Sequence, residues 1–227
     1  AGANDWKCQP KDGQNPVVLV HGTGENAYNN WSMISPELKR AGYCVFALTY
    51  GEVPGVPWPL TAIGGMGLME DSARELAVFV DGVLAATGAS KVDIVGHSQG
   101  TVVPAYYAKY LGGRDKIDKH VSIAPAWNGT TVAGADVVGR TMRELGIKPE
   151  DFPICHACAQ PLFTNVFFRN VQNLREVAVS KSVFFGLDQQ RVRDGRSHAT
   201  EDFFFQLYEF QHLLQKEGFD IGQPVQL

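Results

Sequence analysis

A serine lies at the centre of Gly96 to Gly100, a stretch with the sequence Gly-His-Ser-Gln-Gly. Lys91 to Val95 before it is typical of a short buried strand, and Thr101 to Leu111 after it has apolar residues at helical spacing. A serine in a tight strand-to-helix turn is a nucleophile elbow, and small flanking glycines keep that turn free of collisions. An isolated motif of this kind is more often a turn with a capping serine. The flanking strand and helix favour Ser98 as a nucleophile.

A second motif lies at Pro16 to Gly24, where an apolar, β-branched run ends in His-Gly-Thr-Gly. Such a run is typical of a central parallel strand. Acyl transfer places negative charge on the former carbonyl oxygen, which preorganised N–H groups must stabilise. One donor is the N–H after the nucleophile, at Gln99, and the other comes from an early strand-to-helix loop, at Thr23. We therefore expect Thr23 and Gln99 to form an oxyanion hole, with His21 as a structural residue that shapes the loop.

The elements that must position these residues alternate along the chain. The expected strands are 17–22, 43–50, 91–95, 120–124 and 177–186, and the expected helices lie near 31–41, 68–87, 101–111 and 199–216. Gly88 is placed to end the second helix as its C-cap. Alternation of this kind predicts an α/β fold with a mostly parallel central sheet and helices on both faces.

Several motifs along roughly the first 130 residues together resemble one known group of enzymes. They are Asn4-Asp5-Trp6-x-Cys8, Pro16 to Thr23, Gly42 to Phe46, Gly51, Ser72-Ala73, Thr87-Gly88, Val95 to Gly100, Ala124-Pro125 and Asn128 to Thr131. The chain resembles secreted bacterial lipases and esterases of the α/β-hydrolase superfamily, of the small actinobacterial type. The resemblance implies one α/β-hydrolase domain over residues 1–227. It also implies hydrolysis of carboxylic esters through an acyl-enzyme, with no metal and no cofactor.

In the α/β-hydrolase fold the catalytic serine is followed along the chain by an acid and then by a histidine. Asp188 comes just after the expected strand 177–186, and His198 stands just before the expected terminal helix. We expect His198 to take the proton from Ser98 and return it to the leaving alcohol. Asp188 would hold the imidazole in the correct tautomer.

The spacing of Asp188 and His198 leaves the identity of the acid open. Ten positions separate the two residues, which is short for this fold. Its rivals are acidic residues that lie close by in the sequence: Asp194 first, then Glu176 and Asp202. Other histidines fit the base less well, because His212 lies inside the terminal helix and His120 begins a strand before the acid.

Four cysteines can pair in three ways. The resemblance implies that Cys8 and Cys44 are bridged. Cys155-His156-Ala157-Cys158 has the spacing of a redox pair or of half a zinc site. A redox pair normally opens a helix beside a βαβ unit, and a zinc site needs a second ligand pair. The sequence shows neither a βαβ unit at this point nor a second ligand pair. We therefore expect a small structural disulfide between Cys155 and Cys158, with His156 incidental.

The composition argues against several classes of function. The net charge of −4 without a basic cluster gives no support for nucleic-acid binding or for docking on anionic membranes. No apolar run approaches the ~20 residues of a transmembrane helix. Ala1-Gly2-Ala3 has the small-residue pattern of a signal-peptidase site, which suggests a secreted protein. We expect a monomer.

Residues 128–175 differ in composition from the rest, with many glycines, prolines and apolar side chains. Because α/β hydrolases often carry cap elements at this point of the chain, we expect a cap- or lid-like insertion. It would line an acyl pocket together with the loop that contains Trp58. We expect an ester or lipid substrate, met at a lipid–water interface. Thioesters, amides and polyesters remain alternatives, as does a binding protein whose triad has lost its acid.

Overall fold

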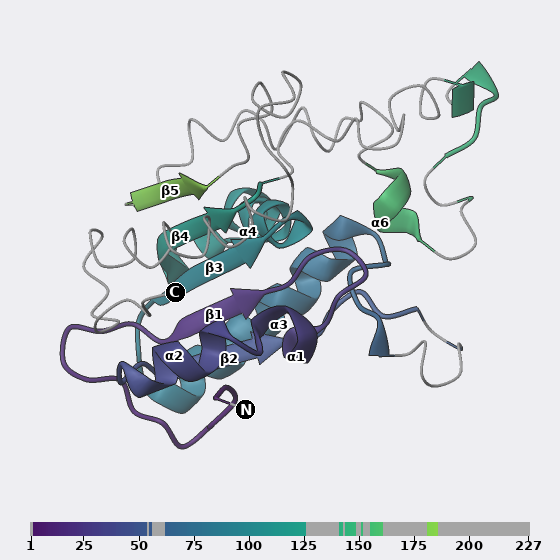
Figure 1. Ribbon diagram of the computed structural model, residues 1–227. Helices are drawn as coiled ribbons and strands as arrows, with labels where there is room; N and C mark the ends of the chain where they lie inside the picture. The colour runs from purple at the N-terminus through teal and green to yellow at the C-terminus, as the bar shows by residue number, and fades with distance from the viewer. Residues whose placement is uncertain are drawn as a thin grey trace.

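A single parallel sheet forms the centre of the molecule (Figure 1). The computed structural model describes residues 2–53, 55, 62–125, 141–142, 144–148, 151, 155–160 and 181–185. Within these ranges the strands are β1 (Val17–Val20), β2 (Val45–Leu48), β3 (Val92–His97), β4 (Ile117–Ile123) and β5 (Lys181–Phe185). Their order is β2-β1-β3-β4-β5, and every neighbouring pair is parallel. The predicted parallel sheet is confirmed.

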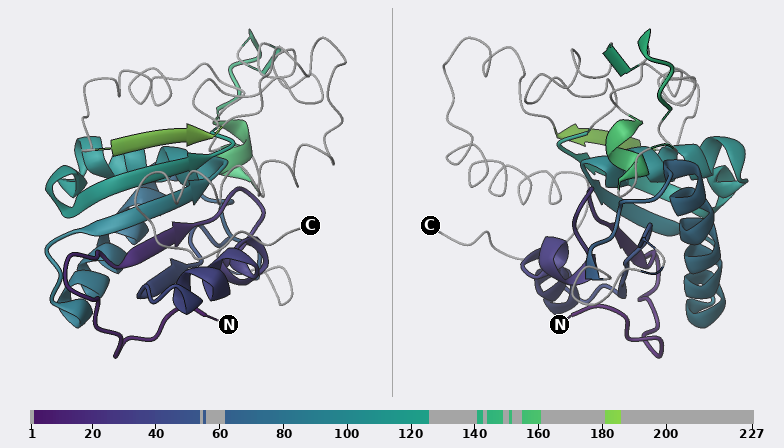
Figure 2. Two further views of the ribbon diagram at one scale, coloured as in Figure 1. Left: turned by 60° about the vertical axis from the view of Figure 1, so that its left-hand side comes forward. Right: turned by 90° about the vertical axis from the view of Figure 1, so that its right-hand side faces the viewer.

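Helices cover both faces of the sheet (Figure 2). They are α1 (Ala27–Trp31), α2 (Ile34–Arg40), α3 (Met69–Thr87), α4 (Gln99–Tyr110), the 3₁₀ turn η2 (Gly113–Lys116) and α6 (His156–Ala159). Alternate residues of β1 pack on opposite sides, since Val17 and Leu19 join Trp31 and Leu38 of α1 and α2. Val18 and Val20 pack with α3 and α4 instead. A strand buried on both faces has to be apolar at every position, as β1 is.

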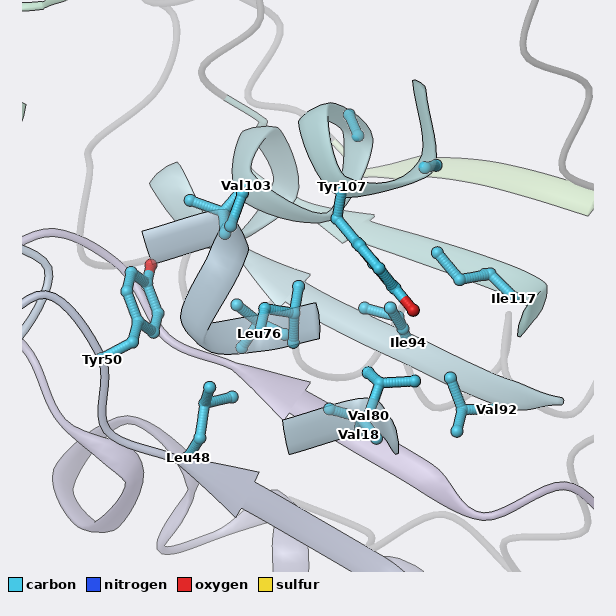
Figure 3. Packing of buried hydrophobic residues seen from close by; sticks show 14 of the residues in the cluster. Val18, Leu48, Tyr50, Leu76, Val80, Val92, Ile94, Val103, Tyr107 and Ile117 are labelled. Carbon is cyan, nitrogen blue, oxygen red and sulfur yellow. The ribbon is translucent and has the colours of Figure 1, made fainter. Parts of the chain in front are cut away.

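The larger core lies between the sheet and the pair α3 and α4. It brings Leu76 and Val80 of α3 together with Val18 and Ile94 of the strands and Val103 of α4 (Figure 3). All five side chains are fully buried. Each contributes about 1.5–3 kcal/mol relative to an exposed position, so the core fixes the helices that flank the elbow.

Some predicted boundaries differ from the structure. The single helix expected near 31–41 is two helices. Helix α1 begins at Ala27 behind a capping box formed by Asn26 and Asn29, and α2 begins separately at Ile34. Strand β4 begins at Ile117 rather than at 120, because Ile117 pairs with Val92 of β3. Helix α3 agrees with the prediction to within one residue, and Gly88 ends it with a φ of 67° in the left-handed region.

The N-terminal segment lies along the outer edge of β2. The backbone N–H of Asn4 donates to Val45 O at 2.9 Å, and the Asn4 side chain exchanges two hydrogen bonds of 2.8 Å with the backbone of Ala47. These bonds cover an edge strand that would otherwise be open to pairing with another chain. A disulfide between Cys8 and Cys44 ties the segment down, which confirms the predicted pair.

Helix α6 caps the start of α3 from far along the chain. The N-cap residue of α3, Leu68, makes no side-chain cap bond. Instead, the side-chain oxygen of Gln160 accepts the Met69 N–H at 2.8 Å, and the Ala157 N–H donates to Met66 O at 3.0 Å. The Cys155–Cys158 disulfide encloses this turn, as the sequence predicted.

No helix in the described ranges has the length and apolar character needed to cross a bilayer. The expected terminal helix, the loop around Trp58 and most of residues 128–175 lie outside the described residues. The expected cap or lid therefore stays a prediction.

Candidate active site

Ser98 lies at the junction of β3 and α4, with a φ of 52° and a ψ of −119°. This left-handed backbone is unfavourable for a residue with a side chain, so its surroundings must hold it in place. The Ser98 N–H donates to Ile123 O at 2.9 Å, and its carbonyl accepts both the N–H and the hydroxyl of Thr101, at 3.1 and 2.7 Å. The Ser98 side chain makes no capping bond to α4. The alternative of a mere capping serine is therefore wrong.

The backbone packs so closely at the elbow that a side chain at Gly96 or Gly100 would collide with it. A Cβ atom on Gly96 would lie 2.1 Å from Gly100 O, and one on Gly100 would lie 2.0 Å from Val20 O. Neither neighbour can move aside, because both are backbone atoms. This confirms that the glycines are there to remove bulk, and it shows that the elbow closes against β1 as well as on itself.

The loop after β1 contacts the elbow through the two residues predicted to form the oxyanion hole. The Thr23 hydroxyl donates to the side-chain oxygen of Gln99, so the two predicted oxyanion residues are in direct contact. A Cβ on Gly22 would lie 3.2 Å from Ser98 Cβ, which shows how closely the loop approaches the nucleophile. Gln99 is the first residue of α4, where N–H groups have no acceptor within the helix and the helix dipole favours a negative charge.

His21 is held as a structural residue, as predicted. Its Nδ1 lies 2.8 Å from Gly22 O, and its Nε2 accepts the Tyr50 N–H at 3.3 Å. The ring stacks on that of Tyr50 with centroids 4.2 Å apart. Burial lowers the pKa of His21. With both ring nitrogens occupied and the neutral form favoured, His21 supports the loop and is not available as a base.

Sequence reasoning missed one polar cluster beside the elbow. Glu25 Oε2 accepts the Gly22 N–H at 2.8 Å and lies 3.1 Å from His97 Nδ1, which is 3.2 Å from the side-chain nitrogen of Asn30. Burial by itself raises the pKa of Glu25, but the bonds from His97 and Gly22 outweigh it and hold that pKa below its ordinary value. The available signal was an acidic residue three positions after Gly22 and a histidine inside the serine motif.

The predicted acid and base lie outside the described residues, as do the rival acids: Asp188, His198, Asp194, Glu176 and Asp202. Strand β5 ends at Phe185, three positions before Asp188. Phe185 pairs with Ile123, whose carbonyl accepts the Ser98 N–H. Strand β5 thus ends at the carboxyl end of the sheet, where Ser98 lies. His120 is buried inside the sheet, and burial lowers its pKa to about 4.

A parallel sheet with helices on both faces and a serine elbow at the carboxyl end of its central strand defines an α/β hydrolase. The model of the family "Lipase (class 2)" matches residues 14–160. The chain belongs to this family.

Two curated relatives are similar to part of the chain. Triacylglycerol lipases of Pseudarthrobacter phenanthrenivorans and Burkholderia plantarii are each 34% identical to it over 98 residues. The matches cover 41% of this chain and 28% and 25% of the relatives, so the chain spans about a quarter of their length.

Solved structures support the fold. The lipase BlEst2 of Bacillus licheniformis in its mature form has a TM-score of 0.52 at 15% identity, covering 73% of this chain and 60% of that one. Its propeptide form gives 0.55 at 17%, covering 78% and 36%.

Proposed function

We propose that this protein is a serine hydrolase that cleaves carboxylic esters through an acyl-enzyme intermediate. The observation that carries the proposal is the backbone of Ser98, held at a φ of 52° above the N-terminus of α4 with Thr23 and Gln99 beside it. Hydrogen bonds from the Ser98 backbone to Ile123 and Thr101 stabilise this unfavourable conformation. An unfavourable conformation that its neighbours stabilise is typical of a functional residue. A serine that merely capped a helix would not need it.

The chemistry follows from these positions and from the predicted triad. Ser98 Oγ attacks the ester carbonyl carbon while His198 accepts its proton, and Asp188 orients the imidazole. The N–H groups of Thr23 and Gln99 stabilise the oxyanion that forms. When the tetrahedral intermediate collapses, the carbon–oxygen bond to the alcohol breaks and His198 returns the proton to the alcohol. Water repeats the sequence on the acyl-enzyme, which releases the acid and regenerates Ser98.

The contact between Thr23 and Gln99 supports a preorganised oxyanion hole. Gln99 is 1% exposed and Thr23 is exposed, so the hydrogen bond between them joins the buried start of α4 to the surface loop after β1. This bond links the two donor residues before any substrate arrives. Loss of one oxyanion donor costs about 10²- to 10³-fold in kcat in other serine hydrolases.

For the substrate, we propose an acylglycerol or another lipid ester met at a lipid–water interface. The names of the two triacylglycerol lipases support this choice. We also propose that the protein is secreted and monomeric. The two disulfides support secretion, since such bonds persist mainly in oxidising compartments.

The test is covalent labelling by a fluorophosphonate together with hydrolysis of p-nitrophenyl esters of increasing chain length. We expect the wild type to be labelled and active, and Ser98→Ala to lose both properties while its circular dichroism is unchanged. Ser32→Ala is the matched control, because Ser32 is an exposed serine outside the elbow. A wild type that is neither labelled nor active would overturn the proposal and favour a binding protein.

A further inference from the structure

One carboxylate oxygen connects the nucleophile elbow with the oxyanion loop. Glu25 Oε2 accepts the N–H of Gly22 at 2.8 Å and pairs with Nδ1 of His97 at 3.1 Å. Gly22 directly precedes Thr23, and His97 directly precedes Ser98. The same oxygen therefore contacts the neighbour of a predicted oxyanion donor and the neighbour of the nucleophile.

The space around Gly22 shows how tightly these groups are assembled. A Cβ atom at Gly22 would lie 2.7 Å from Glu25 Oε2, 3.2 Å from Ser98 Cβ and 3.3 Å from His97 Nδ1. The carboxylate, the nucleophile and the histidine ring thus surround one backbone position. A shift of the loop by a few tenths of an ångström would change all three contacts.

The backbone around Glu25 is held by hydrogen bonds to Gly64. The Gly64 N–H donates to Glu25 O at 2.7 Å, and Gly64 O accepts the Gly24 N–H at 3.0 Å. The next residue, Asn26, caps α1 through its side chain. Glu25 therefore has a fixed backbone, and its side chain spans from this anchor to the elbow.

A carboxylate suits this role better than another side chain. Gly22 and Gly24 have no side chains, so this loop can be held mainly through its backbone N–H groups. An ionised oxygen accepts two hydrogen bonds and makes them about twice as strong as neutral ones. The low pKa of Glu25 keeps it ionised at the pH where an imidazole base is neutral.

We propose that Glu25 is a positioning residue for ester hydrolysis, which sets the separation between the Thr23 amide and the Ser98 nucleophile through Gly22 and His97. The inference rests on the proposed function. The expected signature is a fall in kcat at a nearly constant KM, because the oxyanion forms only in the transition state.

Two substitutions separate the charge of Glu25 from its shape. Glu25→Gln keeps an acceptor oxygen of the same reach and loses the charge, so we expect kcat to fall about tenfold. Glu25→Ala releases the Gly22 N–H entirely, and we expect a fall of about 10²-fold, close to the loss of one oxyanion donor. In both variants KM should stay within about twofold of the wild type.

The matched control is Glu37→Gln. Glu37 also pairs with a basic side chain, that of Arg40, but on the outer surface of α2. The same loss of one carboxylate charge there should leave kcat and KM unchanged. A difference between Glu25→Gln and Glu37→Gln therefore reports on position and not on charge alone.

A second measurement distinguishes positioning from stability. A trifluoromethyl ketone forms a tetrahedral oxyanion with an active serine, so its inhibition constant should rise in step with the fall in kcat/KM. All variants are assayed well below their melting temperatures. If Glu25→Ala loses thermal stability but keeps kcat within twofold, the positioning role is wrong while the esterase proposal stands. If the wild type hydrolyses no ester and binds no inhibitor, both proposals fail.

Discussion

The disulfide between Cys8 and Cys44 allows a prediction whose size follows from the chain it closes. The two cysteines are 36 positions apart. Cross-linking a loop of that length lowers the entropy of the unfolded chain by an amount worth about 4 kcal/mol at 25 °C. The double variant Cys8→Ala with Cys44→Ala should lose about that much unfolding free energy, a large share of the 5–15 kcal/mol typical of a domain.

Urea denaturation followed by tryptophan fluorescence measures this loss. The comparison is the Cys155→Ala, Cys158→Ala pair, whose cysteines are only 3 positions apart and for which the same relation gives about 1.5 kcal/mol. Activity at 25 °C should be within twofold of the wild type in the Cys8/Cys44 variant. The reason is that Cys44 lies at the amino end of β2, whereas Ser98 lies at the carboxyl end of β3, and all the strands are parallel.

A loss below about 1 kcal/mol in the Cys8/Cys44 variant would refute the entropic argument. It would mean that the unfolded chain is already compact enough for the cross-link to remove little of its entropy. A loss of activity at 25 °C in a variant that is still folded would refute the separation between this edge and the active site.

Two further predictions concern titration and the triad. Burial lowers the pKa of His120 to about 4, so the unfolded chain binds more protons than the folded one between about pH 6.5 and 4. Unfolding free energy should therefore be highest above pH 6.5 and fall by about 3 kcal/mol towards pH 4. Urea titrations at several pH values should find this dependence on pH reduced in His120→Gln. An unchanged dependence on pH in that variant would contradict the prediction. Asp188→Asn should keep the fold and lower kcat by up to ~10⁴-fold, because an amide there can hold the wrong tautomer of His198. Asp194→Asn should change kcat little. Steady-state kinetics that show the reverse would assign the acid to Asp194.

The elements predicted best are those whose signals are local. Helix α3 was expected at 68–87 because its apolar residues recur at helical spacing and Gly88 follows them. Strand β1 was expected because a strand buried on both faces must be apolar throughout. The elbow was expected because only a residue order with glycines on both sides of Ser98 fits so tight a turn.

The boundaries that differ depend on partners elsewhere in the chain. Ile117 belongs to β4 because Val92 lies opposite it, and the sequence around Ile117 does not contain that information. Helix α1 begins early because the Asn26 side chain caps it, and that side chain also donates to Ala62 O at 2.8 Å. Each boundary reflects a tertiary or capping contact that outweighs the local hydrophobic pattern.

What the sequence by itself determined is the elbow around Ser98, and it also predicts Ser98 as the nucleophile with Thr23 and Gln99 as its donors. The elbow depends on backbone geometry within a few residues, which the glycines at positions 96 and 100 encode directly. Thr23 lies 76 positions from Gln99 and was predicted from the pattern of its own strand and loop. Only the tertiary structure decided that Glu25 contacts His97, 72 positions away, and that Gln160 caps α3 at Met69, 91 positions away. Hydrogen bonds between distant side chains depend on directions in space, and no periodicity along the chain records those directions.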